Sequence, residues 1–436
     1  MKDGKEKGKE KRKPWVRKRH RVIVFLLYWV VWLMCKLMYG IRYDKRKDGR
    51  QYLILFNHQT PFDQFFPCLM FHGPVYFITS EDIISKGWVS RLLDFLVAPI
   101  PIKKQMTDLK AVRNCLQVAR EGGTIAMAPE GNRTYSGLTC DINPAVSKLA
   151  KKMGLPIALV RFEGGYGFQP RWSNERRRAK KWPWMEAKIA RVIEPDELKS
   201  MSDEELLHTI RAELYQDDAE SVKKTGQRYS HRRNAEYLER VLYVCPNCKL
   251  SQFDSQESEV KCRKCGLTYR LLPDLTLEKV SGSTDNQDFH TVGEWFTWQQ
   301  ETIRQLDLGA MDPEEPLYED RGQFSHVILE SHKDILSEEA LIRLYPDRVE
   351  VTLPQQLPQQ TGSEKSKDYP SVFLFKDVLA ASALGRNKLN LYLGKELYQI
   401  KSDVRFNAVK YVNLFYRYKN IEKGGMIKIN SRGMRS

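Results

Sequence analysis

His58 and Asp63 form the first pair of side chains in this sequence whose types and spacing could do chemistry. They follow the apolar run QYLILFNH, which predicts a buried strand, so both lie where a strand gives way to the next element. A carboxylate that holds one ring nitrogen of an imidazole fixes the tautomer and leaves the other nitrogen to take a proton from a hydroxyl. An alternative stays open, in which Asp63 belongs to the cap of a helix that begins at Thr60 and Pro61, and His58 is an ordinary strand-end residue.

A second candidate is the loop that runs from Pro129 to Arg133, directly after the predicted strand TIAMA. Its arginine and its backbone N–H groups can be presented to a phosphate, and Gly131 permits a close approach. The alternative is that Glu130 and Arg133 only pair with each other at the surface.

The elements around both candidates alternate between strand and helix. Further strands are predicted for PVYFIT, VAPIPI and LPIALVRF. An amphipathic helix is predicted for LKAVRNCLQVAR, and Gly122 and Gly123 end it. Ser202, followed by acidic residues, predicts a helix N-terminus, and the helical pattern continues over residues 200–242. This alternation predicts an α/β sandwich.

NHQTPFD followed by PEGNRT, behind a basic apolar segment, resembles the glycerolipid acyltransferase family typified by 1-acylglycerol-3-phosphate acyltransferases. The resemblance covers residues 20–215. It implies that His58 is the general base that deprotonates the acceptor hydroxyl and that Asp63 orients and stabilises its ring. It also implies that Glu130, Gly131 and Arg133 lie in the motif that binds the acceptor's phosphate.

Two further blocks of the family have partial matches. Lys103 or Lys104 stands where the family usually has an arginine, and a lysine keeps the charge but lacks the bidentate fork. Pro156 matches the proline-bearing fourth block, whereas Asn132 replaces the usual small hydroxyl residue. These departures bear on the identity of the acceptor more than on the class of reaction.

Two Cys-x-x-Cys pairs form a separate motif, made of Cys245, Cys248, Cys262 and Cys265. Two such pairs can surround one tetrahedral zinc ion, and four protein ligands leave no open position, so we expect the zinc to be structural. Zinc ribbons often bind nucleic acid or protein. A membrane-tethered zinc-ribbon adaptor without activity is therefore the alternative of another class.

The charge of the chain is concentrated at its beginning. The sequence carries 71 Lys and Arg against 55 Asp and Glu, a net charge of +16, and most of the excess lies in the first 50 residues. The uncharged run VIVFLLYWVVWLMC follows the basic arm and is shorter than the roughly 20 residues of a perpendicular span. Because both flanks are basic, we favour a helix in the membrane plane or a re-entrant helix over a single span, against an anionic membrane surface.

The tail of the chain is β-rich from residue 324 and ends in a helical pattern, an arrangement similar to a pleckstrin-homology-like barrel. The expected fold is thus an α/β acyltransferase sandwich with an N-terminal hydrophobic anchor helix, a zinc ribbon and this β-rich domain. We expect the following order: a basic arm (1–21), a membrane anchor helix with its basic flank (22–50), an acyltransferase domain (51–215), a helical linker (216–240), the zinc ribbon (241–272), a linker with a short helix (273–323) and the pleckstrin-homology-like domain (324–436).

Together these features predict a membrane-associated O-acyltransferase. We expect it on the cytoplasmic face of the membrane, because the cysteine spacing does not fit a secreted disulfide framework. The acyl thioester donor is acyl-CoA or acyl carrier protein, and the lysophospholipid acceptor is 1-acylglycerol-3-phosphate, giving phosphatidate. Glycerol 3-phosphate or another lysophospholipid stays open as acceptor. No Ser or Cys with its own base is evident, so we expect direct transfer.

The basic, Trp-rich segment 161–191 suits lipid headgroups, and we expect no nucleic acid partner.

Overall fold

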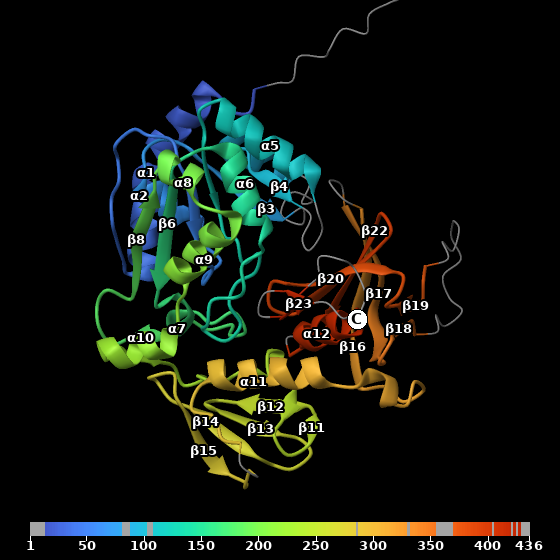
Figure 1. Ribbon diagram of the computed structural model, residues 1–436. Helices are drawn as coiled ribbons and strands as arrows, with labels where there is room; N and C mark the ends of the chain where they lie inside the picture. Colours follow the sequence, from blue (N-terminus) through green and yellow to red (C-terminus); the bar gives the residue numbers. More distant parts are fainter. Residues whose placement is uncertain are drawn as a thin grey trace, which may run out of the picture.

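The computed structural model describes residues 14–80, 88–102, 108–284, 287–328, 332–354, 369–402, 405–419, 422–423 and 426–428. Figure 1 shows three packed parts, which are an α/β part, a small β-rich part below it and a larger β-rich part beside it. Lys103 and Lys104 lie outside the described residues.

The α/β part is built on a seven-stranded mixed sheet with the order β1-β8-β6-β2-β5-β3-β4. Its strands are β1 (Ile41–Tyr43), β2 (Leu53–Phe56), β3 (Val75–Ser80), β4 (Ile100–Ile102), β5 (Thr124–Met127), β6 (Ile157–Glu163) and β8 (Met185–Ile193). All neighbouring strands are parallel except β6 and β8. The predicted α/β fold is therefore confirmed, with β2 and β5 side by side so that both motif loops follow the same edge of the sheet.

Helices cover both faces of this sheet. Successive side chains of a strand point to opposite faces, and every side chain of β2 is buried, so neither face is open at this strand. Ile54 and Phe56 pack on the side of α2 (Phe65–Met70), whereas Leu53 and Leu55 pack on the side of α5, α6 and α9. The bounds of the remaining helices are α4 (Trp88–Val97), α5 (Leu109–Arg120), α6 (Ala145–Met153), α7 (Gly165–Phe168), α8 (Pro195–Ser200), α9 (Asp203–Leu214) and α10 (Asp218–Thr225).

Two helix predictions need correction. The helix expected to begin at Thr60 begins at Phe65, because the backbone N–H of Thr60 is held by the Asp63 carboxylate instead of opening a helix. The helical pattern over 200–242 is broken after Leu214 and again after Thr225, and residues 229–230 form the short strand β9, which pairs with β7 (Arg178–Ala179). The N-terminus predicted at Ser202 is confirmed, with a complete capping box to Glu205.

The apolar N-terminal helix α1 (Lys18–Tyr39) is long and apolar enough to cross a membrane by length and composition. Both of its ends pack against the α/β part. Near its beginning, His20 Nδ1 lies 3.0 Å from the Tyr76 hydroxyl, and near its end Cys35 and Tyr39 are fully buried. Between these ends one face stays open, with Phe25 and Trp29 strongly exposed.

The small β-rich part contains the paired cysteines. Its strands are β10 (Val244–Cys245), β11 (Lys249–Leu250), β12 (Phe253–Gln256), β13 (Glu259–Cys262), β14 (Thr268–Leu271) and β15 (Leu277–Ser281), of which β12 to β15 form one antiparallel sheet. Helix α11 (Val292–Gln305) covers this sheet with Trp295, whose ring lies against Tyr269 and Phe289. Trp295 is fully buried in this packing. Short 3₁₀ turns, η1 (Leu238–Arg240) and η2 (Leu308–Ala310), flank this part.

The tail forms a nearly closed, barrel-like antiparallel sheet of seven strands, followed by one helix (Figure 1). Its elements are β16 (Tyr318–Ile328), β17 (His332–Leu344), β18 (Arg348–Thr352), β19 (Val372–Leu374), β20 (Val378–Leu384), β21 (Lys388–Leu393), β22 (Glu396–Ser402) and α12 (Ala408–Tyr418), with a last pair β23 (Glu422–Lys423) and β24 (Met426–Lys428). The predicted helix is confirmed for Val409, Val412 and Phe415, which are buried on one face of α12, whereas the buried Phe406 lies before the helix begins.

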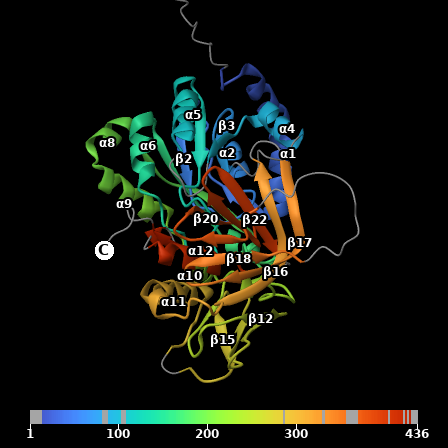
Figure 2. The ribbon, with the colours of Figure 1, turned by 90° about the vertical axis from the view of Figure 1, so that its right-hand side faces the viewer.

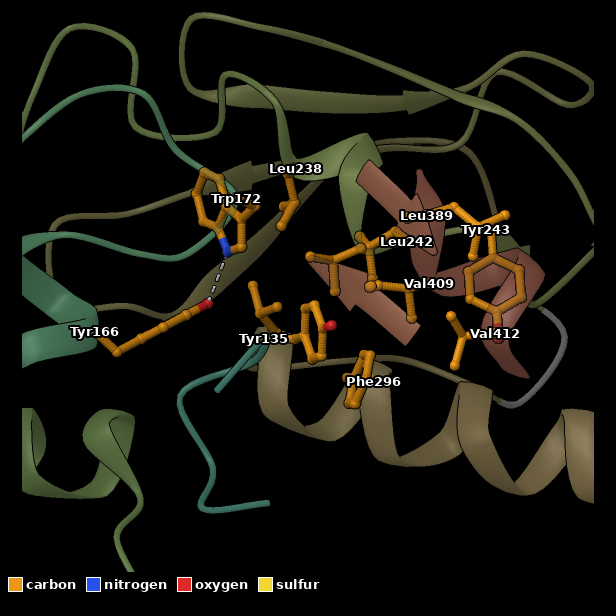
Figure 3. Close-up of a cluster of buried hydrophobic side chains, with 14 of the residues drawn as sticks. Tyr135, Tyr166, Trp172, Leu238, Leu242, Tyr243, Phe296, Leu389, Val409 and Val412 are labelled. Atoms are coloured by element: carbon orange, nitrogen blue, oxygen red, sulfur yellow. Dashed lines mark hydrogen bonds between the residues drawn. The ribbon is translucent and has the colours of Figure 1, made fainter. Parts of the chain in front are cut away.

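One core joins the three parts, and Figure 3 shows where they meet. Tyr135, just after the Pro129–Arg133 loop, stacks on Phe296 of α11 with 6.0 Å between the ring centroids. Leu242 and Tyr243 belong to the same cluster, as do Val409 and Val412 of α12. In Figure 2 the tail lies in front of the α/β part, and Arg171 of that part donates to the carbonyl oxygens of Ala383 and Gly385 at the end of β20. The tail is therefore fixed against the second motif loop.

Candidate active site

Asp63 is fully buried beside His58, with 2.8 Å between Asp63 Oδ2 and His58 Nδ1. Its carboxylate also accepts hydrogen bonds from the backbone N–H groups of Gln59 and Thr60 and from the Thr60 hydroxyl. These contacts fix the carboxylate. It therefore holds the imidazole in one orientation and keeps the ring proton on Nδ1, the nitrogen that faces Asp63. The His58 side chain is 25% exposed, and its Nε2 is the atom suited to act as a base.

Glu130 connects the two motif loops. Its Oε1 accepts the backbone N–H of His58 at 2.6 Å, and its Oε2 accepts the backbone N–H of Cys140 at 2.6 Å. Burial raises the pKa of Glu130 to about 8. The alternative in which Glu130 pairs with Arg133 at the surface is wrong, because Glu130 is buried and both of its oxygens accept backbone N–H groups.

Arg133 lies next to this pair. Its Nε donates to the carbonyl oxygen of Gln59 at 3.2 Å and its Nη2 to that of Gln169 at 3.4 Å. Burial, with the nearby charge of Arg171, lowers the pKa of Arg133 to about 9. Within the described residues Arg133 forms no ion pair, so its charge is balanced by carbonyl dipoles and the more distant Asp63. An anion bound here would relieve that cost.

The other predicted binding residues occupy different places. Gly131 is exposed with a φ of +69°, a left-handed conformation that favours glycine and leaves room above the loop. Pro156 directly precedes β6, and its carbonyl oxygen accepts the N–H of Leu53 at the start of β2. His58 follows the other end of β2, so the structure does not bring Pro156 to His58.

Several residues that support the site were missed from the sequence. Gln59 accepts the N–H of Gly165 at 2.7 Å and donates to Asp218 at 3.1 Å. Asp218 is fully buried, and burial raises its pKa to about 6. The signal in the sequence was the position of Gln59 inside NHQTPFD, but Asp218 lies 159 residues farther along the chain and carries no motif.

Tyr39 brings the apolar helix to the site. It is fully buried, its ring packs on Phe62, Phe66 and Phe168, and its hydroxyl donates to Gln169 Oε1 at 3.2 Å. Gln169 also accepts from Arg133 through its carbonyl oxygen. The last turn of α1 therefore contacts the residues that position the proposed phosphate-binding arginine.

The cysteines nearest the site do not suit nucleophilic catalysis. Burial raises the pKa of Cys68 to about 12 and raises that of Cys140 well above its ordinary value. A thiolate is the nucleophilic form, and no imidazole faces either sulfur in the described residues. This geometry agrees with the expected direct transfer.

The four paired cysteines come together at one point. Their sulfur atoms all lie within 4.8 Å of one another, close to the spacing of about 3.8 Å that tetrahedral zinc with 2.3 Å bonds requires. Gly266, with a φ of +74°, forms the turn after Cys265, and Gly266 N–H donates to the Cys262 carbonyl at 3.0 Å. The donor set fits a structural zinc ion held by Cys245, Cys248, Cys262 and Cys265.

The basic segment 161–191 divides between the interior and the surface. Arg171, Trp172 and Arg177 are buried, whereas the exposed basic residues are Arg176, Arg178, Lys180, Lys181 and Arg191, so most of its charge stays at the surface. Trp182 is 61% exposed and lies under the ammonium of Lys36 from α1, at 5.3 Å from its ring centroid. Only this outer portion of the segment is available to lipid headgroups.

Among solved structures, the chain is similar to the 1-acyl-sn-glycerophosphate (LPA) acyltransferase PlsC from Thermotoga maritima, at 20% identity and a TM-score of 0.35 over 50% of this chain and 86% of that chain. Residues 41–163 match the family model described as Acyltransferase, a range that contains His58, Asp63, Glu130 and Arg133. This part of the chain is an acyltransferase domain.

Proposed function

We propose that the protein is a membrane-associated O-acyltransferase that moves a fatty acyl group from an acyl thioester to 1-acylglycerol-3-phosphate and so forms phosphatidate for phospholipid biosynthesis. The observation that carries the proposal is the contact of 2.8 Å between His58 Nδ1 and the fully buried Asp63, beside the guanidinium of Arg133, which forms no ion pair within the described residues and donates to backbone carbonyl oxygens. A base next to a phosphate-binding group suits an acceptor that carries both a hydroxyl and a phosphate.

The proposed reaction is one direct acyl transfer. His58 Nε2 takes the proton from the acceptor hydroxyl as the hydroxyl oxygen attacks the thioester carbonyl carbon. Asp63 stabilises the imidazolium that forms. The tetrahedral intermediate collapses with cleavage of the carbon–sulfur bond, and the proton on Nε2 passes to the departing thiolate of coenzyme A or acyl carrier protein. Such a base contributes roughly 10²–10⁴-fold.

Arg133 supplies the proposed contact to the acceptor's phosphate. Its planar fork can bind two phosphate oxygens at once, and its partly buried position strengthens each contact. Gly131 leaves space for the phosphate above the loop, as its exposed left-handed backbone indicates. Glu130 acts as a positioning residue, because it holds the backbone of His58 rather than reaching outward.

Helix α1 supports the proposed membrane attachment. Because its two ends pack on the same α/β part, its length of roughly 33 Å runs along the protein rather than away from it. Its open face carries Phe25 and Trp29, and exposed Trp88 and Phe95 of the neighbouring helix α4 continue it. This arrangement supports a helix in the membrane plane, in contact with anionic lipid.

The remaining parts support the site without reacting. A zinc ion held by the four cysteines would stabilise the fold of the small β-rich part, which packs through Phe296 on Tyr135. The strand order of the tail, followed by one helix, supports the pleckstrin-homology-like interpretation. Close packing of the ribbon and the tail on the acyltransferase domain argues against the inactive adaptor.

The test is transfer of labelled acyl groups by the purified full-length protein in vesicles, with acyl-CoA and acyl carrier protein as donors. Acceptors are 1-acylglycerol-3-phosphate, glycerol 3-phosphate and other lysophospholipids. We expect phosphatidate when 1-acylglycerol-3-phosphate is the acceptor, and we expect the His58→Ala variant to form none. No product from any pair with folded, zinc-loaded protein would overturn the enzyme proposal and favour the adaptor.

A further inference from the structure

Arg171 is a buried guanidinium that joins the Pro129–Arg133 loop to the tail. It is 4% exposed and donates to the carbonyl oxygens of Arg133 at 3.0 Å, Ala383 at 3.1 Å and Gly385 at 2.9 Å. Its charge also lies over the ring of Tyr135, at 4.1 Å from the centroid. One side chain thus fixes the turn between β20 and β21 against the loop that carries Arg133.

Arg386 is the next residue in that turn. Its Nη1 donates to Asn174 Oδ1 at 3.2 Å, on the segment of the α/β part that holds Arg171 and Arg176. It is half-buried, and burial together with the charge of Arg176 lowers its pKa. Arg386 is in turn one of the charges that lower the pKa of Arg133.

The contacts of Arg171 therefore bring the loop of Arg133 and the turn of Arg386 to one junction, and the exposed Arg176 adds a third guanidinium whose charge acts on Arg386. Arg133 comes from the loop after β5, Arg176 from the segment before β7 with its charge 5.5 Å from the ring centroid of Tyr39, and Arg386 from the tail. None of the three forms an ion pair within the described residues. The acidic residue that acts on Arg386 is Glu175, which itself lies 3.6 Å from Arg233.

Holding like charges together in a partly buried place is unfavourable unless an anion joins them. Several N–H donors at one point suit the oxygens of a phosphate monoester, which carries close to two negative charges at neutral pH. An acyl chain or an uncharged glycerol would leave these charges uncompensated.

We propose that Arg386 is a specificity-determining residue of the acceptor site, where it joins Arg133 and Arg176 in binding the phosphate monoester of the acceptor headgroup. The seven-stranded tail then supplies part of the active site and selects acceptors that carry a terminal phosphate. This inference rests on the proposed acyl transfer and adds to it a residue outside the acyltransferase domain.

The test compares Arg386→Gln, Arg386→Lys and wild type, with Lys388→Gln as the matched control for loss of one positive charge on the same hairpin. Acceptor KM and kcat are measured with 1-acylglycerol-3-phosphate and with 1-acylglycerol, which lacks the phosphate. We expect Arg386→Gln to raise KM for the phosphorylated acceptor roughly tenfold at little change in kcat, the size of one charge-assisted contact. Turnover of 1-acylglycerol stays as in wild type, and Lys388→Gln behaves as wild type.

A second readout does not depend on turnover. In the His58→Ala background, the Kd of 1-acylglycerol-3-phosphate should rise by a similar factor with Arg386→Gln and by less with Arg386→Lys, which keeps the charge and the fold. Wild-type product with an unchanged KM and Kd in both Arg386 variants overturns this inference alone. Absence of wild-type product from every lysophospholipid overturns the proposed function instead.

Discussion

The backbone N–H of His58 donates a hydrogen bond to Oε1 of Glu130, with 2.6 Å between the two atoms. The other oxygen of the same carboxylate holds the N–H of Cys140. A single buried side chain therefore sets the position of the proposed base relative to the loop that carries Arg133. The two motifs act as one unit although the sequence separates them widely.

Glu130 should make stability depend on pH. Burial raises its folded-state pKa to about 8, above the ordinary value near 4.5, so the folded state binds more protons than the unfolded state between these values. Stability contributed by this group is then complete at low pH and falls as pH rises from about 4.5 to about 8. We expect the Tm of wild type, relative to that of Glu130→Gln, to decrease over this range.

The control for this prediction is Glu204→Gln, an exposed change on α9. Its Tm difference from wild type should stay constant with pH. A Tm difference between wild type and Glu130→Gln that does not change from pH 5 to pH 8 would contradict the assigned pKa shift.

Loss of His58 should remove the chemical step without unfolding the protein. We expect His58→Ala to lower kcat by about 10²–10⁴-fold, since the base is lost while the ring, which is 25% exposed, contributes little to the core. Asp63→Asn should lower kcat similarly and also lower Tm, because an amide places N–H donors against the N–H groups of Gln59 and Thr60. His72→Ala, an exposed histidine outside both loops, is the matched control. Wild-type turnover in His58→Ala removes the mechanism.

Arg133 should act on acceptor binding. We expect Arg133→Gln to raise acceptor KM by roughly 10–100-fold with a smaller effect on kcat, because it removes a contact present in the ground state. Arg133→Lys should recover part of the loss, since lysine keeps the charge without the fork. The exposed Arg178→Gln is the control, measured by the same steady-state kinetics. Equal acceptor KM values in all four proteins would exclude phosphate binding at Arg133.

Metal removal should destabilise the fold beyond the ribbon itself. Purified protein is expected to contain one zinc per chain by elemental analysis, lost in Cys245→Ser and in Cys262→Ser but retained in Cys68→Ser. Chelation should lower both Tm and activity, because α11 packs on the ribbon through Trp295 and on the acyltransferase domain through Phe296. Full activity and an unchanged Tm after complete zinc loss would show that the metal has no structural role.

The open face of α1 should govern membrane binding. We expect Phe25→Glu and Trp29→Glu to reduce binding to vesicles that contain anionic lipid, measured by co-sedimentation, because each places a charge on the exposed face. Turnover in detergent should change little, since both side chains are exposed and Tyr39, at the end of the helix, is unchanged. Leu353→Glu, an exposed apolar position on the tail, is the control. Vesicle binding equal to wild type in both α1 variants would contradict attachment through this face.

The local pattern of the sequence predicted the elements of the α/β part well. The strand from Leu53, the helix from Leu109 and the helix start at Ser202 were all recognisable because each depends on neighbours within a few residues. The helix expected at Thr60 failed for a physical reason, which is that the carboxylate of Asp63 turned back to bind the preceding backbone and His58 instead of following a helical turn.

What the sequence did not show are contacts between distant segments. Asp218 supports Gln59, and Arg171 reaches Gly385, yet neither pair has a spacing that a motif could reveal. The segment around Arg171 was interpreted by its composition as a lipid-facing surface. Its tertiary contacts instead place Arg171 and Arg177 inside the protein, where burial and not composition decides their role.

The three carbonyl acceptors of Arg171 also set an order of events during synthesis. Arg133 emerges from the ribosome early, soon after the apolar helix α1, whereas Ala383 and Gly385 emerge about 250 residues later. Arg171 therefore lacks two of its three partners until the tail has been made. On the proposed function, the acceptor site is completed only when the tail has folded against the loop that carries Arg133.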